Sequence, residues 1–585
     1  MKNPKRVSRR SGSATHNLPE SLKDVTCRVL TARGVMDAER LDLSLAKLLS
    51  TEKFSGIFEA ADIVIEVAKS KGKILIVGDY DADGATSTAL ALTVLSSMGI
   101  KNTGHIIPNR FEFGYGLSVE LVETAFEKYK PDLILTVDNG ISSVEGVERA
   151  KKLGIRVVIT DHHLPGDHLP LAEAIVNPCL ANNNFQSRNL AGVGVIFYLL
   201  GAIRAKLRES DWFVRRSIPV PNLGSFVDLV ALGTVADLVP MDDNNRRLVS
   251  AGLRLIKSGR GNKGILALLK QAGRSLSTLN ADDLAFAVAP RLNAAGRMSN
   301  MSLGIDCLTE KDNEACARSA KTLSDLNDQR KKVENTMQEQ AILIAEEIVN
   351  DYKKEELPFG FCLYKESWHE GVVGIVASRL KEVFYRPVII FAMGKDNQLK
   401  GSARSIEGIH IRDVLAEASA KNPSLIKRFG GHAMAAGLTL RPEMLEEFNI
   451  IFSNILSKKM NQSLIQQTIV TDGVLEAADF ELALAKELYE VTPWGQGFPP
   501  PTFDGDFDIM YTRIVGGLHV SLLLGLPGSD KQLYAIAFNA LEERWCAKGV
   551  KARLVYKLMV NYYRGRESLQ LNILYGTVAD CSVSV

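Results

Sequence analysis

The sequence has few cysteines, and none of them are paired in a recognisable motif. The chain of 585 residues contains seven, and no two are spaced as CxxC. This spacing argues against a structural zinc site and against a disulfide framework. We therefore expect buried thiols and a reducing, cytoplasmic location. The cysteines are Cys27, Cys179, Cys307, Cys316, Cys362, Cys546 and Cys581.

A strong net charge and long apolar runs are also absent. Lys and Arg total 70 and Asp and Glu total 68, a formal net charge of +2, so any site for a polyanion must be local. There is no run of about 18 apolar residues, so no membrane-spanning helix is expected. The basic segment 1–13 is not followed by an apolar stretch and is a poor signal peptide. We expect it to be a solvated tail, with a nucleic-acid or partner contact as the alternative.

The length and composition predict an ordinary globular protein of several domains. The chain is 46% hydrophobic and 24% charged, as is usual for folded domains. At this length a single hydrophobic core is not expected, and two to four domains are.

Three short apolar runs between about residues 50 and 240 predict a parallel sheet. They are "KILIV" (73–77), "PDLILTV" (131–137) and "IRVVIT" (155–160), and segments with apolar residues at helical spacing lie between them. This alternation is typical of an α/β domain, in which ligands bind beyond the carboxyl ends of the strands. The residues expected at those ends are Asp79, Asp81, Asp83, Asp138, Asp161, His162 and His163.

The stretch "VGDYDADGATS" (77–87) puts three aspartates directly after a buried strand. Like charges in a buried place repel each other, so a cation is expected to hold them. Carboxylates with one imidazole suit Mg²⁺ or Mn²⁺, and bridging carboxylates can hold two ions. Another apolar run, "LVALGTVADLVPM" (229–241), ends in Asp237, which we interpret as a further acidic strand end.

Simpler structural roles remain open for each residue taken alone. Asp79 is as readily a helix N-cap, and Asp228 is expected to be structural. The triplet Asp161–His163 is explained by capping and one satisfied histidine. Four acidic strand ends in one sheet are hard to explain by capping. Asn139 and Gly140 predict a tight turn whose backbone N–H groups face a phosphate or simply close the turn.

The remainder of the chain predicts a long helix and two further units. Residues 311–350 contain neither Pro nor Gly and have apolar residues at threes and fours, which predicts one exposed helix or a pair bridging two domains. A second α/β region opens near residue 355. From about residue 465, short alternating strands predict a small β-barrel.

The motifs "VGDYDADGATS", "VDNGIS", "TDHH" and "ALGTVADLVP" resemble the four motifs of the DHH phosphoesterase superfamily. Together with "IPNRFEFGYGLS", "LAGVGV" and "APRLNAAGRM", in matching order over about residues 25–575, they resemble the RecJ family of single-stranded-DNA-specific 5′ exonucleases. The resemblance implies an α/β fold: a DHH-type parallel sheet domain, a long bridging helix, a DHHA1 α/β domain and a C-terminal OB-fold barrel. The expected boundaries are 1–45, 46–310, 311–352, 353–460 and 461–585.

The resemblance also implies a metal site and catalytic roles. The implied ligands are Asp79, Asp81, Asp83, Asp138, His162 and Asp237. All except Asp79 are expected to be catalytic, together with His163 as a phosphate contact. Related pyrophosphatases have a histidine at the position of Val77, so one metal shell must differ from theirs and the role of Asp79 stays open.

Glycine-rich stretches with arginine or histidine are the expected substrate surfaces. Arginine forks bind phosphate, although each arginine is nearly as well explained by a structural carboxylate partner. Ser402 and Arg404 in "KGSARS" are expected to hold a 5′-terminal phosphate, although relatives have Gly in place of Ala403. The further candidates are Arg110, Asn139, Arg291, Asn293, Arg297, His369, Gly430, Gly431 and His432. In the barrel, the candidates for stacking on bases are Trp494, Phe498, Phe503, His519, Tyr562, Tyr563 and Arg564, although core packing explains each aromatic at least as well.

The resemblance implies hydrolysis of single-stranded DNA from the 5′ end with release of 5′-mononucleotides, using two Mn²⁺ or Mg²⁺ ions. It implies roles in DNA repair, recombination and mismatch repair, with single-strand binding protein and a RecQ-type helicase as partners. We expect a monomer. One alternative is a DHH–DHHA1 phosphodiesterase of short oligonucleotides or cyclic dinucleotides, which the predicted barrel argues against. Another is a non-catalytic DNA scaffold, which the complete set of acids argues against.

Overall fold

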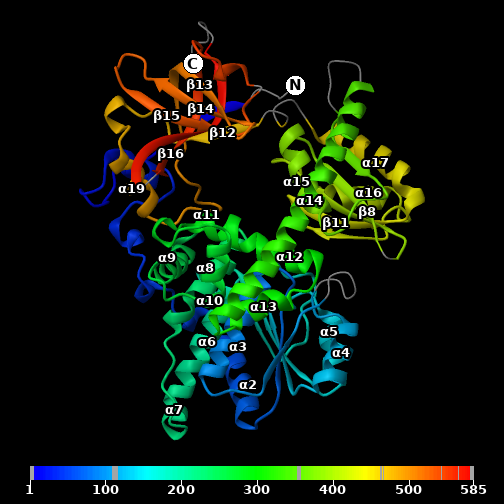
Figure 1. Cartoon of the computed structure of the whole chain (residues 1–585). Coiled ribbons are helices and arrows are strands. Elements are labelled where there is room, and N and C mark those ends of the chain that lie inside the picture. The colour runs from blue at the N-terminus through cyan, green and yellow to red at the C-terminus, as the bar shows by residue number, and fades with distance from the viewer. Residues whose placement is uncertain are drawn as a thin grey trace.

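The first unit of the molecule is a five-stranded parallel sheet between two layers of helices (Figure 1). The computed structural model describes residues 5–108, 116–351, 358–394, 396–460, 464, 467–541, 543–563 and 565–579. The strand order is β3-β2-β4-β5-β6. The strands are β2 (Ile74–Val77), β3 (Thr103–Ile106), β4 (Leu133–Val137), β5 (Arg156–Thr160) and β6 (Ala174–Val176). The helices around them are α2 (Ile57–Lys69), α3 (Ala82–Ser97), α4 (Val119–Tyr129), α5 (Val144–Lys152) and α6 (Gly192–Glu209).

Burial on both faces explains why these strands are continuous apolar runs. In β4, Leu133 and Leu135 pack into the core beneath α2, α3 and α6, whereas Ile134 packs into the core beneath α4 and α5. Every residue of β2 and β4 is buried. From β2 the chain goes to β3 on one side, and it then crosses back to β4 on the other side of β2. The order in which strands are added to the sheet therefore reverses between β2 and β4. Ligands bind at such a point in α/β sheets.

A helical layer follows the sheet and corrects one element of the sequence interpretation. The apolar run before Asp237 is not a strand: it forms α8 (Val227–Ala236), buried on all sides. A wholly apolar segment of this length fits a buried helix as well as a strand, so periodicity could not separate the two. Asp228 is buried in this helix and accepts hydrogen bonds from the backbone N–H groups of Leu229 and Asn262, a structural role.

The long helix predicted near residue 311 is confirmed as the single helix α14 (Asn313–Asp351). It packs on the preceding helices and on α15 of the next unit, so it joins the two. The remaining helices of the first unit are α7 (Trp212–Arg215), α9 (Asp243–Lys257), α10 (Lys263–Gln271), α11 (Ala281–Asp283), a π-helix (Leu284–Val288), α12 (Ala289–Met298) and α13 (Ser302–Thr309).

The second unit is a smaller α/β domain with a mixed sheet in the order β10-β11-β9-β8-β7. Its strands are β7 (Phe361–Tyr364), β8 (Val388–Met393), β9 (Leu399–Arg404), β10 (Arg428–Gly431) and β11 (Ala435–Leu440). Its helices are α15 (Val373–Phe384), α16 (Ile411–Lys421) and α17 (Leu445–Lys459).

The third unit is the predicted barrel, closed in the order β13-β14-β15-β17-β16. Alternate residues point inward, as Val520, Leu522 and Leu524 of β14 do. The strands are β13 (Phe503–Val515), β14 (His519–Gly525), β15 (Gln532–Ala537), β16 (Lys551–Tyr563) and β17 (Arg566–Val578), preceded by α19 (Leu482–Glu490). The barrel and the second unit both lie on one side of the first unit, at the upper left and upper right of Figure 1.

The basic N-terminal segment is not the solvated tail we expected. Within it β1 (Arg6–Arg9) pairs in parallel with β12 (Thr468–Thr471), next to the barrel, and α1 (Asp24–Thr31) contacts α19. The partner strand lies more than 450 residues away in the chain, so no local pattern could reveal it. Among the described residues, no helix is both long and apolar enough to cross a membrane.

Close contact between α12 and the loop after β2 makes Gly296 sensitive to substitution. A Cβ atom at Gly296 would lie 1.9 Å from the carbonyl oxygen of Tyr80, between Asp79 and Asp81. We expect Gly296→Ala to lower the free energy of unfolding by about 1–3 kcal/mol, measured by urea denaturation. The control is Gly201→Ala in α6, where the nearest atom to a Cβ is 3.8 Å away. Equal stability of the two variants would contradict the expectation.

Candidate metal centre and substrate surfaces

The acidic residues predicted at the strand ends converge on one place. Donor atoms within 4.8 Å of one another form three groups that could hold a metal ion. Asp79 and Asp81 follow β2, Asp138 follows β4, and His162 and His163 follow β5. The groups are Asp79–Asp81–Asp138, Asp83–His162–Asp237 and Asp138–His162–His163.

Backbone N–H groups hold the carboxylates in place, and a glycine leaves room for them. Asp81 caps α3 by accepting from the N–H of Gly84 at 3.0 Å. Asp83 accepts from the N–H groups of Gly192 at 2.6 Å and Val193 at 3.0 Å, at the start of α6. A Cβ atom at Gly192 would lie 2.6 Å from Oδ1 of Asp138. The glycine therefore allows α6 to begin directly against the acids.

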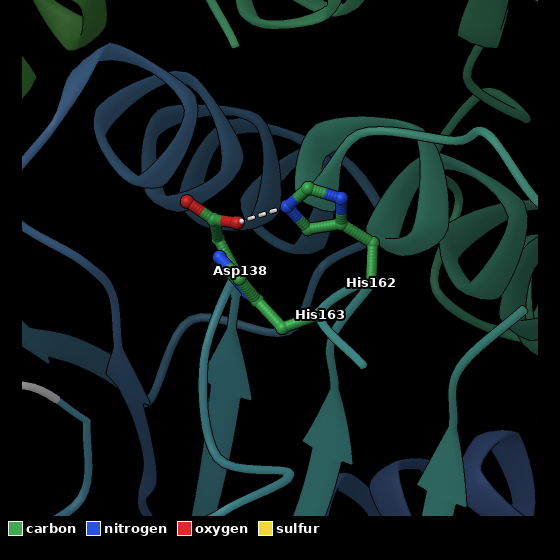
Figure 2. Close-up of side chains that lie close together, drawn as sticks. All are labelled: Asp138, His162 and His163. Carbon is green, nitrogen blue, oxygen red and sulfur yellow. Dashed lines mark ion pairs between the residues drawn. The ribbon is translucent and has the colours of Figure 1, made fainter. Parts of the chain in front are cut away.

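Two of the buried side-chain atoms that lack a hydrogen-bond partner among the described residues lie close to each other. Oδ1 of Asp138 and Nε2 of His162 lie 3.1 Å apart, marked by the dashed line in Figure 2, yet neither makes a hydrogen bond of acceptable geometry. Nε2 of His162 also lies 3.5 Å from Asp237 and 4.0 Å from Asp83. Donors that point at a shared space suit a cation between them.

Burial and mutual repulsion shift the acids away from their ordinary titration. Burial, followed by the charges of neighbouring aspartates, raises the pKa values of Asp79, Asp138 and Asp237 well above the usual range. The same causes raise the pKa of Asp83 to about 7. The charged forms of these carboxyl groups are thus disfavoured without a counter-ion, and a bound cation would stabilise them.

The two histidines are driven in opposite directions. Burial, and then the charge of His163, lower the pKa of His162 to about 4, so its imidazole is neutral and able to coordinate a metal. Burial alone would lower the pKa of His163, but the hydrogen bond between its Nδ1 and Asp161, 2.8 Å long, and that carboxylate's charge raise it to about 9. Asp161 is fully buried and also accepts from the N–H of Ile141. The sequence interpretation placed Asp161 at a strand end without giving it this orienting role.

Three predicted substrate residues make structural contacts. The buried side chain of Asn139 donates to the carbonyl oxygens of Val77 and Val137, tying β2 to β4. Oδ1 of Asn293 accepts from the N–H of Ala82 at 2.8 Å and so holds the start of α3. Nε of Arg291 donates to Ser324 at 2.9 Å, joining α12 to α14. Their contacts with a substrate stay predictions.

The second unit meets the first beside the metal centre. Arg297 of α12 donates to the carbonyl oxygen of Gly371, just before α15, and Nδ1 of His369 accepts from the N–H of Gly371 at 3.0 Å. Burial, and then the positive charges of His163 and other residues, lower the pKa of His432. The "GGH" stretch (430–432) therefore lies within electrostatic reach of the metal centre. Arg110 lies outside the described residues.

Ser402 and Arg404 lie beside the first turn of α15. Nη1 of Arg404 donates to Oγ of Ser402 at 3.0 Å, and a Cβ atom at Gly374 would lie within 3.0 Å of both side chains. Burial lowers the pKa of Arg404, and no carboxylate pairs with it in the part of the chain that the structure describes. A half-buried guanidinium without an acid, next to a helix N-terminus, is suited to an anion.

The two glycines of the "GGH" stretch belong to a strand. Gly430 and Gly431 end β10, and the turn begins at His432. Gly430 pairs with Gly437 of β11, which pairs with Ser402 of β9. Three neighbouring strands therefore carry nothing larger than a hydroxymethyl group in this row, which leaves a flat surface beside Arg404.

The barrel aromatics are mostly different from those predicted. Phe503 belongs to the barrel core, and Phe498 is buried against Trp494 and Arg246, so core packing, the alternative favoured for each aromatic, describes both. His519 contacts Phe538, and Tyr562 is exposed. The side chain of Tyr563 and all of Arg564 lie outside the described residues. The prediction missed the exposed aromatics of β13–β15 and the residue after β15, which are Tyr511, Tyr534 and Phe538.

The acid cluster predicts a pH-dependent stability that a metal ion removes. Because the pKa of Asp83 is about 7 in the fold and near 3.8 ordinarily, the folded chain binds the extra proton between those values. Without metal, we expect the free energy of unfolding to fall by about 1–3 kcal/mol as the pH rises from 4 to 7. Urea denaturation in EDTA measures this, and Mn²⁺ should flatten the profile. Asp83→Asn is the control that should make the profile shallower, with the remaining slope due to Asp79, Asp138 and Asp237. A slope equal to that of the parent would contradict the assignment.

Family comparisons agree with the three units. A model of the DHH family N-terminal domain matches residues 73–234, a DHHA1 domain model matches 358–458, and a RecJ OB domain model matches 471–575. The chain is 46% identical over 575 residues to the single-stranded-DNA-specific exonuclease RecJ of Escherichia coli, covering 98% of this chain and 99% of that one. It is 32% identical to RecJ of Bacillus subtilis, over 94% of this chain and 68% of that one.

A solved structure gives the same result for the fold. The chain resembles the crystal structure of Thermus thermophilus RecJ in complex with Mn²⁺, with a TM-score of 0.77 and 26% identity over 95% of this chain and 76% of that one. The three matched domains and the near full-length identity confirm the family that the motifs indicated. The chain belongs to the RecJ family.

Proposed function

We propose that this protein is a metal-dependent exonuclease that degrades single-stranded DNA from its 5′ end and releases 5′-mononucleotides. The observation that carries the proposal is the acid–histidine centre at the end of β2, β4 and β5, faced by the anion-suited Arg404 of the second unit. The name of the E. coli relative supports the substrate class. The proposed units are the N-terminal extension (1–45), the DHH domain (46–310), the bridging helix (311–352), the DHHA1 domain (353–460) and the OB domain (461–585).

The residues that would hold two divalent ions, Mn²⁺ or Mg²⁺, are the six predicted ligands. Bound ions would supply positive charge to the phosphoryl oxygens and a more acidic water. The overlap of the three donor groups at Asp138 and His162 supports two adjacent positions. His162 is neutral at pH 7, and Asp237 at the end of α8 approaches it from the helical layer. The ligands are Asp79, Asp81, Asp83, Asp138, His162 and Asp237.

His163 is proposed to steady the phosphoryl oxygens of the scissile group. Its pKa of about 9 keeps the imidazole protonated at neutral pH, and its Nδ1 is committed to Asp161. Nε2 is then the nitrogen that can donate to a substrate oxygen. A charged donor held by a buried carboxylate needs no reorganisation when negative charge builds up on the phosphoryl group.

The second unit is proposed to bind the terminal 5′-phosphate and thereby set the polarity. Ser402, Arg404 and the first turn of α15 form the anion site, and the flat glycine row beside it leaves room for the terminal nucleotide. Arg297, His369 and His432 line the junction between this site and the metal centre. Arg110, Arg291 and Asn293 remain proposed substrate contacts from the sequence.

The barrel is proposed to bind the rest of the single strand. An OB barrel offers exposed aromatic rings on which bases stack, and Tyr511 and Tyr534 flank Leu523 across three neighbouring strands. The matched OB domain disfavours an enzyme for short oligonucleotides or cyclic dinucleotides. Action as a monomer in cytoplasmic DNA repair and recombination, alongside single-strand binding protein and a RecQ-type helicase, stays a prediction.

The activity is tested with single-stranded DNA labelled at either end. We expect labelled mononucleotide to appear early from the 5′ label with Mn²⁺, and none with EDTA. Asp138→Ala should reduce the rate by at least about 10³-fold, because it removes a group shared by two of the donor groups. Early release from the 3′ label would contradict the polarity. Cleavage of only very short oligonucleotides would favour the phosphodiesterase.

The polarity site is tested by comparing 5′-phosphorylated and 5′-hydroxyl substrates. We expect the parent protein to prefer the phosphorylated strand. Arg404→Met should lose most of this preference, a change of about 10–100-fold in kcat/KM, because a charge-assisted bidentate contact is removed. The matched control is Arg318→Met on α14, an exposed arginine that pairs with Glu314 of the same helix. If Arg404→Met slows both substrates equally, Arg404 does not read the 5′-phosphate.

A further inference from the structure

The N-terminal segment 5–42 contacts both the barrel and the first unit, which are otherwise far apart in sequence. Three of its arginines make separate contacts with carboxylates: Arg9, Arg33 and Arg40. The segment also adds the strand β1 to β12, which leads into the barrel. It is therefore neither solvated nor confined to one unit.

The first contact, made by Arg9, is with the barrel itself. Asp504 in β13 has a fully buried side chain, and it accepts from Nη2 of Arg9 at 2.7 Å and from Nε of Arg9 at 3.1 Å. Thr471 donates to it at 2.6 Å, and Arg553 of β16 donates at 3.2 Å. Arg9 thus makes a bidentate contact with the barrel wall, while two other donors remain if it is removed.

The second contact, made by Arg33, is a fully buried ion pair. Arg33 donates to both oxygens of Asp472, at 2.7 and 2.9 Å, and the two side chains are only 2% and 1% exposed. Nε of Arg33 donates to the carbonyl oxygen of Pro499, and its guanidinium lies 5.3 Å from the ring centre of Trp494. Nη1 of Arg10 also lies 3.6 Å from Asp472. Removing Arg33 would leave this buried carboxylate with only the longer contact, so the Arg33 pair is the main link between the two segments.

The third contact, made by Arg40, is with the first unit of the molecule. Arg40 donates to both oxygens of Asp243 in α9, at 2.7 and 3.0 Å. The neighbouring Arg246 of α9 is completely buried; it donates to the carbonyl oxygen of Arg40 and to Thr492, just after α19. Its guanidinium lies 4.5 Å from the ring centre of Phe498. The segment thus ends on the same helix that receives the barrel's leading loop.

We propose that residues 5–42 are a strap that fixes the position of the barrel relative to the first unit, and that Arg9, Arg33 and Arg40 are positioning residues for long single strands. The inference rests on the proposed function. A strand held at the metal centre and on the barrel gains an effective concentration at the second site only while the two sites keep a fixed separation. A substrate too short to reach the barrel gains nothing from the strap.

The test measures kcat and KM of the full-length protein with single strands of about 4 and about 50 nucleotides, with Mn²⁺. For Arg33→Met we expect KM for the long strand to rise about 10-fold or more, with kcat within about twofold and the short strand unchanged. Arg33→Lys should recover part of the loss because it restores the charge. Lys23→Ala is the matched control: it removes an exposed ion pair between the same segment and Glu481 and should change nothing.

A second variant keeps the test decisive if Arg33→Met does not fold. Arg9→Ala leaves Asp504 with Thr471 and Arg553 as donors, and it should show the same length-dependent rise in KM at smaller size. Equal loss on long and short strands, or no loss on either, would overturn the strap. A parent protein that cuts neither strand would instead overturn the proposed function, and the strap with it.

Discussion

The repulsion among buried carboxylates at the ends of β2 and β4 is the constraint that the rest of the molecule serves. Several acids share a space from which water is largely excluded, and burial raises the pKa values of Asp79, Asp138 and Asp237. The fold offsets part of this cost with oriented dipoles, since the first N–H groups of α6 bind Asp83. The positive charge of His163 also opposes the rise in the pKa values of Asp79, Asp83 and Asp237.

The same constraint explains why a second α/β unit is needed. A centre built from acids repels a phosphodiester, so the positive charge that attracts and orients the substrate must come from elsewhere. In the proposed function, Arg404 and the N-terminus of α15 supply it from the second unit, which meets the first at Arg297 and Gly371. Helix α14 joins the two units. Separation of the acidic and basic groups keeps each from neutralising the other.

Local periodicity and the residue types at strand ends predicted much of the fold and of the acidic site. The strands that precede Asp79 and Asp138, the long helix and the barrel all have patterns that depend on near neighbours in sequence. Asp237 was assigned to the right cluster but to the wrong element, because an all-buried helix has no polar face to reveal its period. The inward contacts of Asn139 and Phe498 could not be predicted for a different reason. An amide or an aromatic ring in a glycine-rich loop has the same local sequence whether it points at a ligand or into the protein.

The N-terminal segment shows the limit of such reasoning most clearly. Arginines are usually exposed, and a stretch such as "KRVSRR" is therefore taken to be solvated. Here Arg9 and Arg33 bind Asp504 and Asp472, more than 400 residues later in the chain, and the side chains of both acids are buried. No local pattern reveals either pair, because the two partners lie far apart in the sequence. The two ends of the chain are thus joined by paired charges that neither segment shows by itself.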